Sequence, residues 1–439
     1  MSSPTPLLIG DLIQKNANTY PRRVAAWMGG DSLTFAELDE SADRLAQALR
    51  ARGVVHGDRI VVWADTCLEV LPLFVALAKL GAVFAPLNAR LGTAEAAVIV
   101  KMAQPRMLVA DAGHLQGAIE IASELGIERV GSLLAPDPGS HVMDLRPNQL
   151  AACPEAIDEP ALAETDPHVI FFTSGSTGAP KGVMLSHRAN YLRTYQGVFL
   201  TEEERSVCMF PLFHMAAFTL ALSAWQTQGE IAFVEAATAE EILEAVEARS
   251  ANRLYCIPAV WNRILELDAE RFNVSSLRWI DTGTSATSIE LLKALKSRFP
   301  GSVVRVYYGS TEAGAGTTLM DADVLLKPGS VGLPSPGVDL RIGDGGEICL
   351  RTHYLMDGYF NNPEATREAL QDGWYHTGDI GTLDEEGYLF VVGRIKELIR
   401  TGGEAVAPAE VEAALSRHPG IRELAVVGIP DPQWGEVVC

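Results

Sequence analysis

The sequence predicts an α/β protein with a large N-terminal domain and a small, partial α+β C-terminal domain. Its 439 residues exceed the size at which a single hydrophobic core stops growing, so more than one domain or subdomain is expected. Up to about residue 325, short apolar strands alternate with amphipathic helices, which is typical of a mainly parallel sheet covered by helices. Beyond about residue 330, short strands separated by Gly and Asp turns predict a small antiparallel unit.

These patterns divide the chain into an N-terminal domain over 1–393 and a C-terminal segment over 394–439. The predicted N-terminal parts are two layered βαβ-type subdomains and the antiparallel β unit, over 1–160, 161–325 and 326–393. The C-terminal segment holds the last predicted helix and the start of a small domain. Because the chain ends in the apolar run EVVC without a turn or a cap, we expect that domain to be truncated.

The first elements follow from helix signals and apolar runs. Thr34 and Glu37 form a T-x-x-E capping box, and apolar residues then recur at helical spacing until Gly53, which predicts an amphipathic helix. The next predicted elements are strands and helices in alternation, at 59–64, 67–80, 106–110 and 114–125. The most membrane-like run, 70–87, contains Lys79 and prolines near both ends, so we expect a buried helix followed by a turn.

The alternation resumes after a Pro-rich connection through 135–160. Predicted strands lie at 168–172, 183–186, 231–235, 253–257, 277–281 and 303–309, and predicted helices lie at 239–249 and 288–299. The antiparallel unit is expected within 338–351 and 387–394, and a last helix within 408–418.

Charge and cysteine content exclude several classes of protein. The formal net charge of −21 repels phosphates at long range, which argues against nucleic acids and anionic membranes as general partners. Six scattered cysteines without C-x-x-C spacing indicate reduced thiols, and the N-terminus lacks the pattern of a signal peptide. We therefore expect a cytoplasmic protein without a transmembrane segment, which binds any anion through a local device.

The stretch TSGSTGAPKG, residues 173–182, is the strongest candidate for such a device. It is not a Walker A loop, because Lys181 is followed by Gly182 and then by a predicted strand rather than a helix. Hydroxyls, free backbone N–H groups and one charge can still hold phosphate oxygens. These groups come from Thr173, Ser174, Gly175, Ser176, Thr177, Gly178 and Lys181. A plain Gly/Ser linker is the alternative.

Three further stretches suit a nucleotide, although each alone has a simpler explanation. YYGSTEAG, 307–314, offers Thr311 as a hydroxyl donor to phosphate and Glu312 as a ligand for Mg²⁺, but it could be a turn. Tyr308, Gly309 and Ser310 beside them are further candidate cofactor-binding residues. WYHTGD, 374–379, ends in Asp379, whose carboxylate can accept hydrogen bonds from both ribose hydroxyls, but a Gly-Asp pair is often a turn. GRIKELIRTGGE, 393–404, suits a basic strand and a flexible turn, or a solvated basic face.

Taken together, the four motifs, with GYFNNPEAT (358–366) between them, resemble the adenylate-forming superfamily of acyl-CoA synthetases, aryl-CoA ligases, luciferases and peptide-synthetase adenylation domains. The resemblance extends from about residue 10 to the end and is closest to fatty or aryl acid CoA ligases. It implies that the 173–182 loop and Thr311 hold the ATP phosphates, with Lys181, Thr311, Glu312 and His214 as catalytic candidates. It also implies that Asp379 and Arg394 bind the ribose side.

The resemblance also implies roles for the remaining site residues. Lys396 stands at the family's hinge, and Arg400, Gly402 and Gly403 match the thiol tunnel, with Arg400 replacing a more common lysine. Gly283, Thr284 and Ser285 match the adenine segment, although the last two depart from its usual small apolar residues. His214 matches a gate of the acyl pocket, with a structural core histidine as the alternative. The pocket is expected to be apolar, and Tyr307, where relatives often have glycine, to reshape it.

The implied function is an ATP-dependent acid–thiol ligase that forms an acyl-AMP and transfers the acyl group to CoA, with ATP, Mg²⁺, CoA and a carboxylic acid as partners. Because no aspartate stands in the pocket to pair with an amine, a fatty or aryl acid is expected rather than an amino acid. An acyl-AMP ligase that loads a carrier protein and a nucleotide-binding protein without ligase activity remain alternatives. The oligomeric state stays open, with a homodimer among the options.

Overall fold

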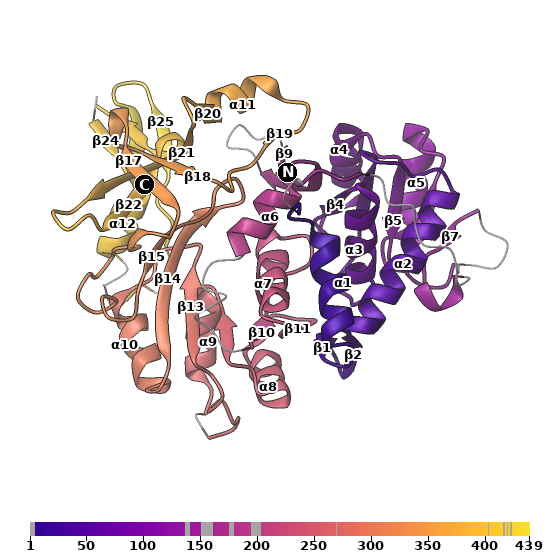
Figure 1. The fold of residues 1–439 in the computed structure, drawn as a ribbon. Coiled ribbons are helices and arrows are strands. Elements are labelled where there is room, and N and C mark those ends of the chain that lie inside the picture. Colours follow the sequence, from indigo (N-terminus) through magenta and orange to yellow (C-terminus); the bar gives the residue numbers. More distant parts are fainter. Residues whose placement is uncertain are drawn as a thin grey trace.

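The computed structural model describes residues 5–136, 141–150, 161–174, 180–194, 203–268, 270–402, 404–415, 418, 420–421 and 424–439. Among these residues the strands form four sheets (Figure 1). No helix in the described ranges is both long and apolar enough to cross a membrane.

The first sheet is mainly parallel and carries one face of the candidate site. Its strand order is β16 (Leu333–Pro334), β15 (Gly314–Leu319), β14 (Val303–Ser310), β13 (Trp279–Gly283), β12 (Arg253–Tyr255), β10 (Arg205–Cys208), β11 (Glu230–Phe233), β1 (Val24–Met28) and β2 (Asp31–Thr34). Neighbours from β14 to β1 pair in parallel, so their carboxyl ends lie along the same edge. Ligand sites of α/β proteins form at this edge.

The second sheet contains the hairpin that holds the predicted phosphate loop. Its strand order is β19 (Gly358–Tyr359), β9 (Pro180–Ser186), β8 (Pro167–Ser174), β4 (Val83–Leu87), β3 (Arg59–Trp63), β5 (Met107–Ala110), β6 (Val130–Ser132) and β7 (Met143–Asp144). Strands β8 and β9 are antiparallel, with Thr173 opposite Lys181. The predicted strand after the phosphate loop is therefore confirmed.

The described ranges contain twelve α-helices, most of which pack on these two sheets, whereas the last one contacts the strand Leu389–Arg394 of a smaller sheet. They are α1 (Ile9–Thr19), α2 (Phe35–Ala51), α3 (Val70–Leu80), α4 (Thr93–Ala103), α5 (Leu115–Leu125), α6 (His187–Thr194), α7 (Met215–Gln226), α8 (Ala239–Arg249), α9 (Pro258–Glu266), α10 (Ile289–Arg298), α11 (Pro363–Ala369) and α12 (Pro408–Leu415). The predicted capping box at Thr34 and Glu37 is present at the start of α2.

Three apolar clusters show how the layers pack. One cluster lies between the first and second sheets and contains α1, α2, α3 and α7. The other two lie on the outer faces, under α8, α9 and α10 on the first sheet and under α4 and α5 on the second. Figure 1 shows these helices on both sides of the two sheets. The predicted layered α/β architecture is confirmed.

The smaller sheets lie beside the carboxyl edge of the first sheet. The third sheet has the order β17 (Val338–Ile342), β18 (Glu347–Thr352), β21 (Trp374–Leu383) and β20 (Leu370–Gln371), with β22 (Leu389–Arg394) paired to β21. The fourth has the order β24 (Glu404–Val406), β23 (Ile399–Thr401), β26 (Gly435–Val438) and β25 (Gly428–Asp431). Both are antiparallel, as the sequence predicts for the chain beyond 330.

Two of the departures from the predicted element order concern how the sheets are assembled. The run 70–87 contains a second element, because the chain turns at Gly81, where φ is +68°, and continues as the buried strand β4. Strands β1 and β2 pair with each other and join the first sheet through β11, and β4 pairs with β8. The sheets therefore mix segments from both sides of residue 160, and the subdomain boundaries stay a prediction.

Candidate functional site

A cleft of about 710 Å³ opens where the carboxyl edge of the first sheet meets the second and third sheets. It gathers most of the site residues that the sequence predicts. Those that line it are Thr173, Lys181, His214, Thr284, Tyr308, Gly309, Ser310, Thr311, Glu312, Asp379, Arg394 and Lys396. Residues more than 200 positions apart in the sequence thus share one cavity.

The other predicted residues lie beside the cleft, in the fourth sheet, or outside the described ranges. Gly283 and Ser285 flank Thr284 without lining the cavity. Arg400 and Gly402 belong to β23 and the turn after it. The residues outside the described ranges are Gly175, Ser176, Thr177, Gly178 and Gly403, and the side chain of Ser174 is likewise not described.

Asp379 is held in place at the third-sheet side of the cleft. The hydroxyl of Tyr308 donates a hydrogen bond of 2.7 Å to its Oδ2, and Nε of Arg394 lies 3.2 Å from its Oδ1. Burial raises the pKa of the Asp379 carboxyl, while Tyr308 and Arg394 act in the opposite direction. Each carboxylate oxygen has one such partner and retains further acceptor capacity for a ligand hydroxyl.

The backbone before Asp379 is fixed by Glu347. Its Oε1 accepts a hydrogen bond of 2.9 Å from the N–H of Gly378, and its Oε2 lies 2.7 Å from Nδ1 of His376. Thr377 Oγ1 donates to the carbonyl of Ile348 and accepts from the N–H of Asp379. The tight turn at Gly378, where φ is +74°, is therefore pinned on both sides.

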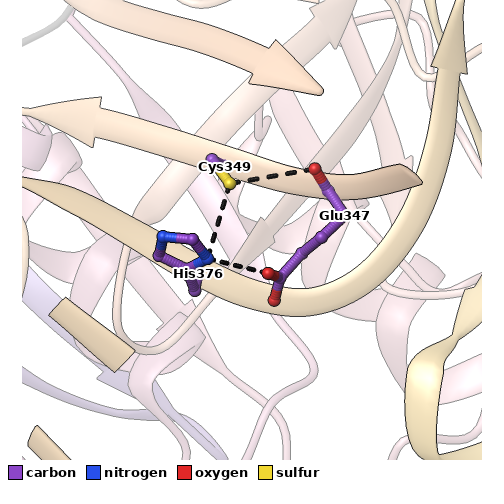
Figure 2. Close-up of side chains that lie close together, drawn as sticks. All are labelled: Glu347, Cys349 and His376. Carbon is purple, nitrogen blue, oxygen red and sulfur yellow. Dashed lines mark hydrogen bonds and ion pairs between the residues drawn. The ribbon is translucent and has the colours of Figure 1, made fainter. Parts of the chain in front are cut away.

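Figure 2 shows Glu347, Cys349 and His376 together, a set of side chains that could bind a metal ion. Sγ of Cys349 lies 3.7 Å from Nδ1 of His376. Both carboxylate oxygens of Glu347 are already used, however, and burial raises the pKa of the Cys349 thiol, which disfavours the thiolate that binds metals. These contacts favour a structural role in holding the turn before Asp379.

The loop between β14 and β15 presents Thr311 and Glu312 to the cleft. Tyr359 donates a hydrogen bond of 3.0 Å to Oε1 of Glu312, and Nζ of Lys181 lies 4.7 Å from the centre of the Tyr359 ring. Behind the loop, Nη1 of the buried Arg193 donates to the carbonyl of Thr311 over 3.1 Å. Burial lowers the pKa of Arg193 to about 10, which still leaves it charged near neutral pH.

His214 caps the N-terminus of α7 and also lines the cleft. Its Nδ1 accepts the N–H of Ala216 at 3.1 Å, so a neutral ring carries its proton on Nε2. Its ring stacks on Phe210 with centroids 5.4 Å apart, and burial lowers its pKa. Thr284, on another wall, has φ of +66°, a strained value for a β-branched residue.

The sequence predicts an apolar acyl pocket, and the lining of the cleft is apolar on one side and polar on another. Met215, Ala216 and Leu220 of α7 are apolar, as expected. The polar wall, as we call it, consists of Ser223, Arg253, Tyr255 and Tyr307. Its members come from α7, β12 and β14, and the sequence does not show that these elements meet.

Two family profiles match the chain. The AMP-binding enzyme profile matches residues 13–360, and the AMP-binding enzyme C-terminal domain profile matches residues 410–439. The chain belongs to the AMP-binding enzyme family. The predicted superfamily is thereby confirmed.

Relatives of this AMP-binding enzyme include named CoA ligases. A feruloyl-CoA synthase of Amycolatopsis sp is 34% identical over 98% of this chain and 87% of its own. A long-chain-fatty-acid–CoA ligase of Mycobacterium tuberculosis is 30% identical over 98% of this chain and 87% of its own. Among solved structures, o-succinylbenzoate CoA synthetase from Bacillus subtilis, in complex with its acyl-adenylate intermediate, has a TM-score of 0.87 at 26% identity and covers 100% of this chain and 88% of its own.

Several site residues of this AMP-binding enzyme were not predicted from the sequence. Arg193, Tyr359, Glu347 and His376 contact predicted site residues or fix their backbone. Only Tyr359 and His376 carried a signal, because they stand inside two of the quoted motifs. Arg193 and Glu347 lie in ordinary helix and strand patterns.

Proposed function

We propose that this chain activates a carboxylic acid with ATP as an acyl-AMP, releases pyrophosphate, and transfers the acyl group to the thiol of CoA. The observation that carries the proposal is that one cleft contains Asp379 with its partners, the Thr311–Glu312 loop with Lys181, and His214. The named relatives are CoA ligases for aryl and fatty acids, which supports the same reaction class here.

The nucleotide end of the cleft would be organised by the third sheet. Asp379 accepts hydrogen bonds from the ribose hydroxyls, and Arg394 beside it places a positive charge near the ribose and phosphates. Gly309 and Ser310 have small or no side chains, so their backbone can approach the nucleotide, and Thr284 lies on the adenine side. The phosphates extend toward Thr311, Thr173 and Lys181, where hydroxyls and one ammonium offset their charge.

Glu312 fits a role in holding Mg²⁺ with the phosphates. Its Oε1 accepts from Tyr359, while its second oxygen makes no hydrogen bond to the described residues. Magnesium in nucleotide sites is commonly held by one or two carboxylates together with phosphate oxygens. Bound there, the ion would neutralise developing phosphate charge.

The chemistry needs positioning more than a protein nucleophile. A carboxylate oxygen of the acid attacks the α-phosphorus, and the bond from that phosphorus to pyrophosphate breaks. The CoA thiolate then attacks the acyl carbon, and the carbon–oxygen bond to AMP breaks. Lys181 and the Thr311 hydroxyl would stabilise charge in the first step, because preorganised donors in a partly closed cleft are worth more than in water.

The second step would use the segment after β22. Lys396 lies at the edge of the cleft, between the third and fourth sheets, where a rotation of the fourth sheet would bring a new surface to the acyl-AMP. Arg400, Gly402 and Gly403 would then approach the CoA arm. A carrier protein in place of CoA is the alternative acceptor.

The test combines two assays on the purified chain. ATP–pyrophosphate exchange is measured with a panel of fatty, aryl and amino acids, followed by CoA-dependent release of AMP. Exchange with an amine-free carboxylic acid and AMP release on adding CoA are expected. Exchange without a response to CoA would favour a carrier protein, and nucleotide binding without any exchange would reject the ligase.

A further inference from the structure

The polar wall of the cleft, formed by Ser223, Arg253, Tyr255 and Tyr307, is anchored to a buried ion cluster. Nε of Arg253 donates 2.6 Å to Oδ2 of Asp281, and its Nη1 donates to Oε1 and Oε2 of Glu204 at 3.1 and 3.0 Å. Arg305 donates to both oxygens of Asp281. Asp281 is fully buried, so these bonds hold Arg253 in one orientation.

The cluster is electrically balanced without a ligand. Arg253 and Arg305 supply two positive charges, and Glu204 and Asp281 supply two negative ones. A further carboxylate placed against Arg253 would leave an uncompensated negative charge in a partly dry site, which is costly. A neutral oxygen atom would carry no such cost.

Hydrogen-bond donors nevertheless remain on this wall. Nη2 of Arg253 and the hydroxyls of Tyr255 and Tyr307 make no hydrogen bond to any described residue, although all three side chains line the cleft. Burial raises the pKa of both tyrosines, so their hydroxyls keep the proton that they can donate. Gly283 permits this arrangement, because a Cβ there would lie 2.9 Å from the Tyr255 hydroxyl.

A plain hydrocarbon chain would suit this wall poorly. Packing methylenes against three donors would remove water from them without offering an acceptor, and buried donors without partners are unfavourable. The apolar side chains of Met215, Ala216 and Leu220 on α7 can cover the rest of the acyl group. The cleft therefore combines an apolar side with a fixed patch of donors.

We propose that the polar wall binds a neutral oxygen substituent, such as a hydroxyl, methoxy or keto group, on the acyl part of the acid beyond its carboxylate. The inference rests on the proposed ligase function and narrows its substrate class to oxygenated acids. Arg253, Tyr255 and Tyr307 donate to the substituent, and Ser223 keeps Arg253 in place through its hydrogen bonds to Nη1 of Arg253 and to Glu204.

The test compares acids that differ by one oxygen. Exchange kinetics are measured for benzoate against 4-hydroxybenzoate, 3-phenylpropanoate against its 4-hydroxyphenyl analogue, and octanoate against 8-hydroxyoctanoate, with octanedioate as the charged analogue. We expect kcat/KM to favour the hydroxylated acid by about 100-fold or more in at least one pair, since a site that hydrogen-bonds a substrate hydroxyl strongly rejects the analogue without it. Equal or better use of every plain acid would overturn the inference.

Variants assign the preference to the wall. Replacing Arg253 would leave Glu204 and Asp281 buried without a partner and could unfold the protein, so Tyr255→Phe and Tyr307→Phe are the informative changes. Each should reduce about ten-fold the ratio of kcat/KM for the hydroxylated acid to kcat/KM for the plain acid, as expected for loss of one hydrogen bond. Tyr388→Phe, outside the cleft, is the matched control and should keep the wild-type ratio.

Four results would contradict the assignment. An unchanged ratio in both tyrosine variants would remove the wall from substrate recognition. Preference for octanedioate over 8-hydroxyoctanoate would show that the wall binds an anion despite the balanced charges of the buried ion cluster. Exchange with plain acids alone would overturn this inference but leave the ligase intact, whereas exchange with none of the acids would reject both.

Discussion

At the scale of single residues, Asp379 shows how a short motif gains a function from its surroundings. The sequence identifies it as a ribose ligand, but its partners Tyr308 and Arg394 come from β14 and from the end of β22. Residue types in a motif can be read directly, whereas the contact between Tyr308 and Asp379, 71 positions apart, depends on how the first and third sheets pack. Of the polar wall, only Tyr307 was predicted to shape the pocket, because the meeting of Ser223, Arg253 and Tyr255 with it also depends on the fold.

Replacing Asp379 with alanine should weaken the binding of ATP and AMP by about 2–4 kcal/mol, because each hydrogen bond to a charged group is worth roughly 1.5–3 kcal/mol. Isothermal titration calorimetry on the folded variant measures this. Asp339→Ala is the control, since Asp339 is an exposed acid of the same sheet that pairs with Arg351 away from the cleft. Wild-type nucleotide affinity in Asp379→Ala would disprove the assignment.

Glu347 is expected to act on nucleotide binding through the turn that it holds. Glu347→Gln keeps an acceptor for the Gly378 N–H but weakens the contact with His376. The KM for ATP should therefore rise about ten-fold, which corresponds to the loss of one hydrogen bond to a charged group. The KM for the acid should change little. Glu385→Gln, an exposed change on the turn between β21 and β22, is the control. A lower unfolding temperature with an unchanged KM for ATP would show a purely structural role.

At the scale of elements, α3 shows how a charged residue belongs inside an apolar run. Lys79 interrupts the membrane-like sequence, and in the fold its ammonium lies 2.7 Å from Oδ1 of Asp39 and 2.5 Å from Oδ1 of Asp43 on α2. The side chain of Lys79 is 3% exposed. The sequence predicts the buried helix. The contacts with Asp39 and Asp43 on α2 explain how a lysine can stand inside it.

Lys79→Met should lower the free energy of unfolding by about 3 kcal/mol at neutral pH, because removing one member of a buried ion pair leaves the other without compensation. The hydrogen bonds to Asp39 and Asp43 raise the pKa of Lys79 above its ordinary value despite burial. Its contribution is thus complete below about pH 10.4 and is lost as the pH rises through the folded pKa. Urea unfolding at neutral and alkaline pH tests both points, with the exposed Lys101→Met as control. A gap between wild type and Lys79→Met that does not shrink at high pH would contradict the linkage.

At the scale of the whole molecule, periodicity and motifs predicted the layers, the hairpin around the phosphate loop, the antiparallel units and the common cleft. They did not predict that β1 and β2 join the first sheet, because Val24–Thr34 carries no signal for partners near residue 231. Likewise, a strand at 83–87 is hidden in an apolar run that reads equally well as helix. Local patterns specify elements, whereas long-range pairing decides which elements share a sheet.

The proposed rotation of the fourth sheet would move one part of the molecule relative to the rest. Lys396 lies in the short helical turn Ile395–Glu397, between the third-sheet strand β22 and the fourth-sheet strand β23. Proline at this position would fix φ near −65° and remove an N–H, so the chain could keep its present conformation but not rearrange freely. Lys396→Pro should therefore retain ATP–pyrophosphate exchange, while thioester formation falls by about 10²-fold, as expected when reacting groups are misplaced by about 1 Å or more.

Single-turnover assays of each half-reaction, with Lys396→Ala to account for the lost charge, separate the two effects. Equal losses in both half-reactions, beyond those of Lys396→Ala, would show that residue 396 serves the cleft as it stands and that the second step needs no rotation there.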